Sequence, residues 1–323
     1  MDFKPSNIRM WSRLGPSGAI SAVATEFGKE NPEVVFLTAD MTSASGLERF
    51  KKSYPDRLYN VGIAEQNTVG IATGLAEMGF VPYAATYASF FATRALDQVK
   101  MCMGYMKSNV KLLGLYAGAS TGIMGPTHMS IEDISAIRAI PNITIESPAD
   151  TTEIVKTLIH IKDYDGPVYV RLTGDMNSSV VYDEDFEFQI GKANKLSEGK
   201  DLAIFATGSM VDAAGKTANL LSEVGIESTV YDIHTIKPFD TDCLKDSLDY
   251  KLIVTMEEHS IIGGLGSTVL EGLSEFDYKG KVLRFGFSDE YPHAASYKYI
   301  LDRQGLSPET MSHKISEYIK GIC

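Results

Sequence analysis

Cysteine is scarce in this sequence of 323 residues. The three cysteines, Cys102, Cys243 and Cys323, lie far apart, and none belongs to a C-x-x-C pair. A disulfide framework or a structural zinc site needs numerous or closely spaced cysteines. We therefore expect ordinary reduced thiols and no metal site in this chain.

Clustered positive charge and long apolar runs are also missing. The 42 acidic residues outnumber the 30 basic ones, which gives a formal net charge of -12 without a basic block. Proteins that hold a nucleic-acid backbone need concentrated positive charge, so we expect no nucleic-acid partner. No apolar segment approaches the roughly 20 residues that cross a bilayer, and residues 1–13 do not resemble a signal peptide. We expect a cytoplasmic protein without a membrane partner.

Three familiar site motifs do not occur. The Gly-Gly-Leu-Gly loop at 263–266 lacks the G-x-G-x-x-G spacing, and no G-x-x-x-x-G-K-[ST] is present. Glu257-Glu258-His259 has no second histidine at helical spacing. These absences argue against a dinucleotide site, a P-loop and a zinc-protease site.

Short apolar segments alternate with segments of helical periodicity along the chain. Residues 34–37, 110–116 and 167–172 are typical of buried strands, whereas 17–29 and 152–161 have helical spacing. This alternation predicts an α/β fold with mainly parallel sheets covered by helices. Residues 1–13 show no clear period, which predicts a loop before the first helix.

The alternation is interrupted once, between residues 174 and 191, where acidic residues gather and the periodicity fades. An apolar content of 44% in a chain of this length is enough for two cores. We therefore expect a first domain at 1–180, a linker at 181–191 and a second domain at 192–323.

One stretch places an acid where a helix begins. Glu65 lies in Asn-Val-Gly-Ile-Ala-Glu-Gln-Asn at 60–67, and Tyr87, Phe90 and Phe91 follow a second strand-like segment at 83–87. A carboxylate and flat side chains can meet in one crevice there. From these residues alone, a helix-start acid favoured by the helix dipole, with aromatics in the core, is the simpler interpretation.

Two further residues stand at the ends of strand-like segments. His128 ends a glycine-rich loop at 117–128, and loops of this length are often functional. Its imidazole could exchange hydrogen bonds with a substrate. Arg171 suits capture of a phosphate or carboxylate, or equally a structural ion pair. The residues alone leave both questions open.

Several motifs occur in a fixed order over nearly the whole chain. They are the stretch at 60–67, Arg-Ala-Leu-Asp-Gln at 94–98, Gly-Pro-Thr-His at 125–128, Pro-Asn-Ile at 141–143, Ser-Pro-Ala-Asp at 147–150, and the segments 232–240 and 257–267. Together they resemble the thiamine-diphosphate-dependent transketolases, specifically the C-terminal half of the enzyme in its split, two-subunit forms.

The resemblance implies a pyrimidine-binding domain followed by a transketolase C-terminal domain. Such an enzyme transfers a two-carbon ketol unit between sugar phosphates or related compounds. A separate domain with a Gly-Asp-Gly motif holds the diphosphate and Mg²⁺ in this family, and the nearest string here is Thr-Gly-Asp-Met at 173–176. The resemblance therefore implies an N-terminal partner subunit, an active site between chains, and two copies of each chain.

The resemblance also assigns roles to residues. Glu65 would hydrogen-bond a pyrimidine nitrogen and favour the imino form of the cofactor, helped by surroundings that disfavour its charged form. Tyr87, Phe90 and Phe91 match positions near the pyrimidine ring, and Tyr87 and Phe90 are favoured for stacking. The other matches are Asp40 and Met41 near the cofactor, and Ser43, Tyr116, Met124, His128 and Arg171 near the substrate or its phosphate, with His128 also counted as catalytic.

Two positions depart from the family pattern. Transketolases commonly have a histidine where this chain has Tyr116 and an acid where it has Met124. Both usual residues contact hydroxyl groups of the donor sugar, and a thioether cannot replace an acid in that role. We expect a donor or acceptor other than the usual ketose and aldose phosphates, with fewer hydroxyl groups.

Three other functions fit parts of the pattern. A 1-deoxyxylulose-5-phosphate synthase shares the pyrimidine domain but is normally one long chain with its own diphosphate domain. The beta subunit of a 2-oxo-acid dehydrogenase would have a different histidine loop and a lipoyl-domain partner. A non-catalytic paralogue is the third alternative, and the presence of Glu65 and the aromatic residues argues against it.

Overall fold

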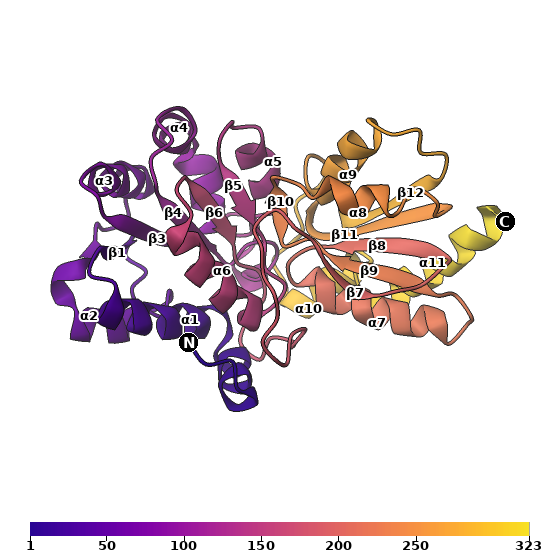
Figure 1. Ribbon diagram of the computed structural model, residues 1–323, viewed down its shortest axis with the longest axis horizontal. Coiled ribbons are helices and arrows are strands. Elements are labelled where there is room, and N and C mark those ends of the chain that lie inside the picture. Colours follow the sequence, from indigo (N-terminus) through magenta and orange to yellow (C-terminus); the bar gives the residue numbers. More distant parts are fainter. Residues whose placement is uncertain (323) are drawn as a thin grey trace.

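The computed structural model describes residues 1–322, which form two α/β units side by side (Figure 1). The first unit contains a seven-stranded sheet and the second a five-stranded sheet, both mainly parallel. The predicted fold class is therefore confirmed. Cys102 and Cys243 are free thiols, and Cys323 lies outside the described residues.

The first sheet has the strand order β10-β5-β6-β4-β3-β1-β2. Its strands are β1 (Val34–Thr38), β2 (Leu58–Asn60), β3 (Val81–Tyr87), β4 (Lys111–Leu115), β5 (Thr144–Glu146), β6 (Val168–Arg171) and β10 (Thr235–Lys237). All neighbours are parallel except β10, which runs antiparallel to β5. The central strands β1 and β4 are buried along their whole length, as expected of a parallel sheet covered on both faces.

Helices cover both faces of this sheet (Figure 1). They are α1 (Pro5–Glu30), α2 (Glu48–Ser53), α3 (Glu65–Glu77), α4 (Leu96–Gln98), α5 (Asp133–Arg138) and α6 (Thr151–Asp163), with π-helical turns η2 (Phe90–Arg94) and η3 (Val99–Tyr105) and 3-10 turns η1 (Pro55–Arg57) and η4 (Gly122–Met124). Phe36 of β1 packs with α1 and α6, whereas the next residue, Leu37, packs with α3 and η3. The two-residue period of the strand thus divides the apolar residues between two cores.

The N-terminal segment differs from the prediction of a loop. Helix α1 already begins at Pro5 and is broken at Gly15, whose φ of 69° lies in the left-handed region. Pro16 then begins the second part of the helix. Ile8 and Trp11 are both buried, and these two apolar residues attach the otherwise polar segment to the core. A period carried by so few positions does not stand out in the sequence.

The second unit has the strand order β12-β11-β8-β9-β7. The strands are β7 (Asn194–Ser197), β8 (Leu202–Ala206), β9 (Ser228–Asp232), β11 (Leu252–Ser260) and β12 (Lys281–Phe287). The helices are α7 (Met210–Ser222), α8 (Thr241–Lys245), α9 (Leu265–Leu273), α10 (Tyr297–Arg303) and α11 (Pro308–Ile322). Only β7 is antiparallel to its neighbour, at the edge of the sheet.

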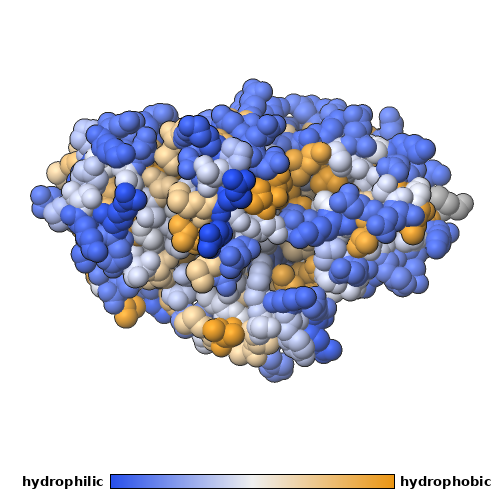
Figure 2. All heavy atoms as spheres, turned by 90° about the horizontal axis from the view of Figure 1, so that it is seen from below, coloured by the Kyte–Doolittle hydropathy of each residue, from blue (hydrophilic) through white to orange (hydrophobic). Residues whose placement is uncertain are grey.

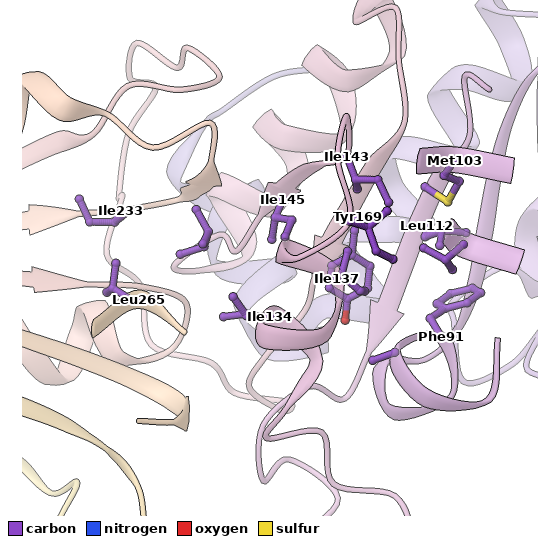
Figure 3. Packing of buried hydrophobic residues seen from close by; sticks show 14 of the residues in the cluster. Phe91, Met103, Leu112, Ile134, Ile137, Ile143, Ile145, Tyr169, Ile233 and Leu265 are labelled. Carbon is purple, nitrogen blue, oxygen red and sulfur yellow. The ribbon is translucent and has the colours of Figure 1, made fainter. Parts of the chain in front are cut away.

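The two units share a continuous apolar core. In Figure 3, Ile233 and Leu265 of the second unit lie next to Ile145 and Ile134 of the first. All four residues belong to one buried cluster. Strand β10 also comes from the second half of the chain but extends the first sheet. The units are therefore joined by packing and by strand pairing as well as by the connecting segment.

The outer surface seen in Figure 2 is mostly hydrophilic, with several apolar patches between the polar areas. Within residues 1–322, no helix combines the length and the apolar character that crossing a bilayer requires.

Candidate active site

A cavity of about 530 Å³ lies where β1 and β3 end. Asp40, Met41 and Ser43, which follow β1, line one part of it, and Tyr87 at the end of β3 and Phe90 of η2 line another. The remaining lining includes Ile63, Glu65, Arg94 and His128. In open parallel sheets the carboxyl ends of strands are the usual place for a ligand, because loops diverge there and leave a crevice.

Glu65 is the buried acid of this cavity. It is the first residue of α3 and is only 2% exposed. Its Oε2 accepts a hydrogen bond from Arg94 Nη1 at 2.8 Å. Among the described residues none donates to Oε1. A fixed carboxyl oxygen is therefore available to a donor from outside the chain.

Aromatic rings form the wall beside Glu65. The ring centroids of Tyr87 and Phe90 are 5.4 Å apart, and the imidazole of His128 meets both edge-on, at 5.2 and 5.4 Å. The guanidinium of Arg94 lies 4.0 Å from the centroid of the Phe90 ring, in cation–π geometry. Burial raises the pKa of the Tyr87 phenol, so this residue stays a neutral donor at physiological pH.

Asn60 ties two strand ends together at the rim. Its amide nitrogen donates to Asp40 Oδ1 at 3.1 Å, and its amide oxygen accepts from the backbone N–H groups of Asp40 and Gly62, each at 3.1 Å. Asp40 has a φ of 58°, a conformation that non-glycine residues rarely adopt. This local network holds the turn after β1 and the approach to α3 in one arrangement.

The residues expected near the substrate lie around the same opening. Tyr116 has a φ of 56°, and its ring lies 5.4 Å from that of Tyr87. It lines a smaller adjoining cavity of about 170 Å³, which shares Ser43 with the first. The Met124 sulfur accepts from the Tyr87 hydroxyl at 3.8 Å, and His128 Nδ1 lies 2.9 Å from Thr127 Oγ1.

Phe91 corrects the expectation for the aromatic run. It is fully buried in the apolar core, where Figure 3 shows it near Met103 and Leu112. The π-helical turn η2 directs Phe90 to the cavity and its neighbour into the protein. Phe91 therefore supports the cavity wall from behind and does not line it.

Arg171 corrects the expectation of a substrate-binding cation. It is fully buried, and its Nε donates to both carboxylate oxygens of Asp133 at 3.0 and 2.9 Å. Its Nη2 donates to the Glu258 carbonyl at 2.7 Å. The structural ion pair is thus the correct alternative, because Asp133 from α5 and β11 of the second unit enclose the guanidinium.

Arg94 and Asn60 belong to motifs but had no role assigned from the sequence. Arg94 lies four residues after Phe90, and this helical spacing was the available signal that both face the same crevice. Its pairing with Glu65 joins residues 29 positions apart and depends on the packing of η2 against α3.

The described residues contain no group of three or more histidine, cysteine, aspartate or glutamate side chains arranged to hold a metal ion. The cavity itself carries the carboxylates of Asp40 and Glu65 on different elements. Its chemistry is that of a half-apolar slot with one buried carboxyl group.

Comparison with known proteins gives the same family over both units. Residues 16–176 match the family model described as the transketolase pyrimidine binding domain, and residues 191–311 match the transketolase C-terminal domain. A putative transketolase C-terminal section from Methanocaldococcus jannaschii is 36% identical over 297 residues, covering 91% of this chain and 93% of that protein.

Two further relatives have the same extent. The 6-deoxy-6-sulfo-D-fructose transketolase subunit SqwH of Clostridium sp. is 36% identical over 296 residues, covering 90% of this chain and 91% of that protein. A solved structure described as a split gene transketolase, inactive beta4 tetramer, has a TM-score of 0.85 and 34% identity and covers 95% of this chain and 98% of that chain. The resemblance seen in the motifs is confirmed.

Proposed function

We propose a function from one premise: this chain belongs to the transketolase family, as the subunit with the pyrimidine-binding and C-terminal domains. It is part of a transferase that depends on thiamine diphosphate and needs a partner subunit. In our proposal this chain holds the pyrimidine ring of the cofactor, and Glu65 is its catalytic acid–base group. The partner subunit holds the diphosphate and Mg²⁺.

The observation that carries the proposal is that Oε1 of the nearly buried Glu65 accepts no hydrogen bond from the described residues. Because Glu65 lines the cavity and Arg94 donates to Oε2, Oε1 remains an acceptor for a donor that enters the cavity. A protonated or imino nitrogen of a pyrimidine is a donor of suitable size for this oxygen. Tyr87 and Phe90 offer apolar faces to the same ligand. The residues of this cavity therefore fit the aminopyrimidine half of thiamine diphosphate.

Each group has a definite task in this proposal. Bound thiamine diphosphate supplies a carbon nucleophile that accepts and passes on a two-carbon ketol unit. Glu65 shares a proton with the ring nitrogen, and the buried position of its carboxyl group keeps competing water away. His128 exchanges hydrogen bonds with substrate oxygens at the open side of the slot, where it contacts Tyr87 and Phe90 by its edges.

The partner subunit completes the opening. Exposed apolar side chains surround this side of the molecule: Ile63 is 75% exposed, and Ile123 and Met124 of the glycine-rich loop are 81% and 46% exposed. Such residues are suited to a protein interface. The related tetramer of beta chains alone is described as inactive, which supports a requirement for the N-terminal subunit. We propose an assembly with two copies of each chain.

The substrate is proposed to be a sugar phosphate or analogue with fewer hydroxyl groups than the usual donors. Met124 and Tyr116 stand where an acid and a histidine would bind hydroxyls, and a relative is named for a sulfonated deoxysugar. Met124→Asp should then increase kcat/KM for xylulose 5-phosphate. Efficient turnover of xylulose 5-phosphate by the unmodified pair would contradict this part of the proposal.

Calorimetry on three samples tests the half-site. Thiamine diphosphate with Mg²⁺ is titrated into this chain, into its N-terminal partner, and into the reconstituted pair. We expect high-affinity binding by the pair alone and ketol transfer by the loaded pair. Tight binding by the isolated chain, or none by the pair, would overturn the proposal. Consumption of pyruvate would indicate a 1-deoxyxylulose-5-phosphate synthase, and acyl transfer to a lipoyl domain would indicate a 2-oxo-acid dehydrogenase. Cofactor binding without turnover would indicate a non-catalytic paralogue.

A further inference from the structure

Glu258 lies in the second unit, yet its carboxylate holds the glycine-rich loop of the first. The residue belongs to β11 and is fully buried. Its Oε1 accepts a hydrogen bond of 2.7 Å from the backbone N–H of Ala119. Ala119 follows β4 and belongs to the loop 117–128, which carries His128 to the cavity and Met124 to the Tyr87 hydroxyl.

The other carboxylate oxygen is held by its own unit. Glu258 Oε2 accepts from the hydroxyl of Tyr297 at 2.5 Å and from the hydroxyl of Ser209. The Glu258 backbone carbonyl also accepts from Arg171 Nη2 at 2.7 Å. With donors on both oxygens and on the main chain, the carboxylate has one well-defined position from which to hold Ala119.

A second contact fixes the loop nearer to Met124. Ala295, just before α10, donates from its backbone N–H to the Gly122 carbonyl at 3.1 Å. A Cβ atom at Gly122 would lie 2.5 Å from Ile300 Cδ1 and 2.6 Å from the Ala295 carbonyl oxygen, so only glycine permits this approach. The turn η4 therefore rests directly on the second unit.

The loop is also closed at its base. Gly118 and Ser130 exchange two backbone hydrogen bonds, of 2.8 and 2.9 Å, and so bring its ends together. A Cβ at Gly118 would come within 2.2 Å of Glu258 Oε1, which shows how closely the carboxylate approaches the backbone there. The Gly118–Ser130 pair and the Gly122 contact therefore restrain the backbone of the loop on the way to His128.

We infer that Glu258 and Tyr297 are positioning residues for the substrate side of the site, and that the second unit sets the position of the loop 117–128. This inference rests on the proposed function, since it assigns the loop to the substrate. The cofactor side is built on other elements, since Glu65 begins α3, Tyr87 ends β3 and Phe90 lies in η2, and the loop meets it at one edge through Met124 and His128. Loosening the loop should therefore weaken substrate binding more than cofactor binding.

A pair of tyrosine variants tests the inference in the full chain with its partner subunit. Tyr297→Phe removes one donor from Glu258. Tyr182→Phe is the matched control, because the hydroxyl of this half-buried residue donates to the buried Asp232 at 2.6 Å and not to Glu258 or to the loop. We expect Tyr297→Phe to raise KM for the donor substrate about 3- to 30-fold, with a smaller change in kcat. The control should leave KM unchanged, and in Tyr297→Phe the affinity for thiamine diphosphate should change less than KM.

Hydrogen exchange of the same variants gives a readout without catalysis. We expect faster amide exchange in residues 117–128 for Tyr297→Phe and unchanged exchange there for Tyr182→Phe. Unaltered exchange in Tyr297→Phe, or equal effects of the two variants on KM, would overturn the inference. Since exchange does not depend on turnover, a pair that lacks ketol-transfer activity would contradict the proposed function while the exchange result still decides the role of Glu258.

Discussion

Buried carboxylates occur in two regions of this molecule with different surroundings. At the boundary of the two units, both oxygens of Glu257 accept backbone hydrogen bonds, from Leu265 at 2.7 Å and Gly266 at 2.8 Å. Glu258 is also bonded through both oxygens. In the cavity, Glu65 has a single hydrogen-bond partner among residues 1–322, Arg94. Glu257 and Glu258 thus hold parts of the fold together, whereas Glu65 keeps one oxygen for a ligand.

The boundary also shows how a buried charge is made tolerable. Arg171 and Asp133 are both fully buried, and the Tyr169 hydroxyl adds a third bond of 2.7 Å to Asp133. Burial opposes the charge on Arg171, but the Asp133 carboxylate and neighbouring groups outweigh it and raise the pKa of the guanidinium. A site that must still accept a ligand cannot be completed in this way by its own chain.

The largest expected effect is that of Glu65→Gln. The amide keeps the shape of the side chain and an oxygen for Arg94, but it cannot share a proton with the cofactor. We expect turnover of the reconstituted pair to fall about 10²- to 10⁴-fold while assembly is retained. Steady-state kinetics and gel filtration measure both. Glu77→Gln, at the exposed far end of the same helix, is the control, and equal activity of the two variants would remove Glu65 from catalysis.

Arg171→Met tests the buried ion pair at the boundary of the two units. It leaves the Asp133 carboxylate buried without its cation, and breaking such a pair costs about 3–5 kcal/mol. Urea unfolding of the isolated chain should show this loss in the free energy of unfolding. Arg171→Lys should recover part of it. A stable Arg171→Met protein with weakened substrate binding would instead restore the substrate-binding role that the buried position of Arg171 contradicts.

Phe90 and Phe91 are adjacent in the sequence, but one lines the cavity and the other lies in the apolar core, so their alanine variants should have different effects. Phe91→Ala removes a fully buried ring from the core and should lower the free energy of unfolding by about 3–5 kcal/mol. Phe90→Ala should destabilise the chain less but raise the Kd of thiamine diphosphate for the pair about 10-fold, because it removes one apolar wall of the slot. Denaturant unfolding measures the loss of stability, and calorimetry measures the Kd. If Phe90→Ala were the more destabilising variant and Phe91→Ala the one that weakens cofactor binding, the assignment of the two rings would be wrong.

The smallest expected effect is on the pH dependence of stability. Burial raises the pKa of Glu257 to about 7 and that of Asp150 to about 6, so the folded chain holds protons that the unfolded chain has released. Burial also lowers the pKa of His259 to about 4, which acts in the opposite direction below pH 6.5. The acids prevail, and the free energy of unfolding should fall by about 1–2 kcal/mol from pH 5 to pH 7.

Chemical unfolding at several pH values measures this slope. Glu257→Gln does not titrate at this position and should flatten the fall. A free energy of unfolding that rises from pH 5 to pH 7 would show that the buried acids are already ionised in the folded chain at pH 5.

Local patterns in the sequence determined the α/β class and the place of Glu65. The alternation that sends Phe36 to one core and Leu37 to the other is carried by adjacent residues of β1. The stretch that brings Glu65 to the first position of α3 is equally local. Such features depend on residues within a few positions of one another, so periodicity and motif order were sufficient to predict them.

Tertiary structure alone decided which of these residues meet. Arg171 contacts Asp133, which lies 38 positions away, and Glu258 contacts Ala119 across 139 positions. Phe90 and Phe91 have nearly the same sequence environment but opposite surroundings, because a π-helical turn packs against α3 and α5. Burial and pairing of polar groups follow from how distant elements pack, and no local pattern contains that information.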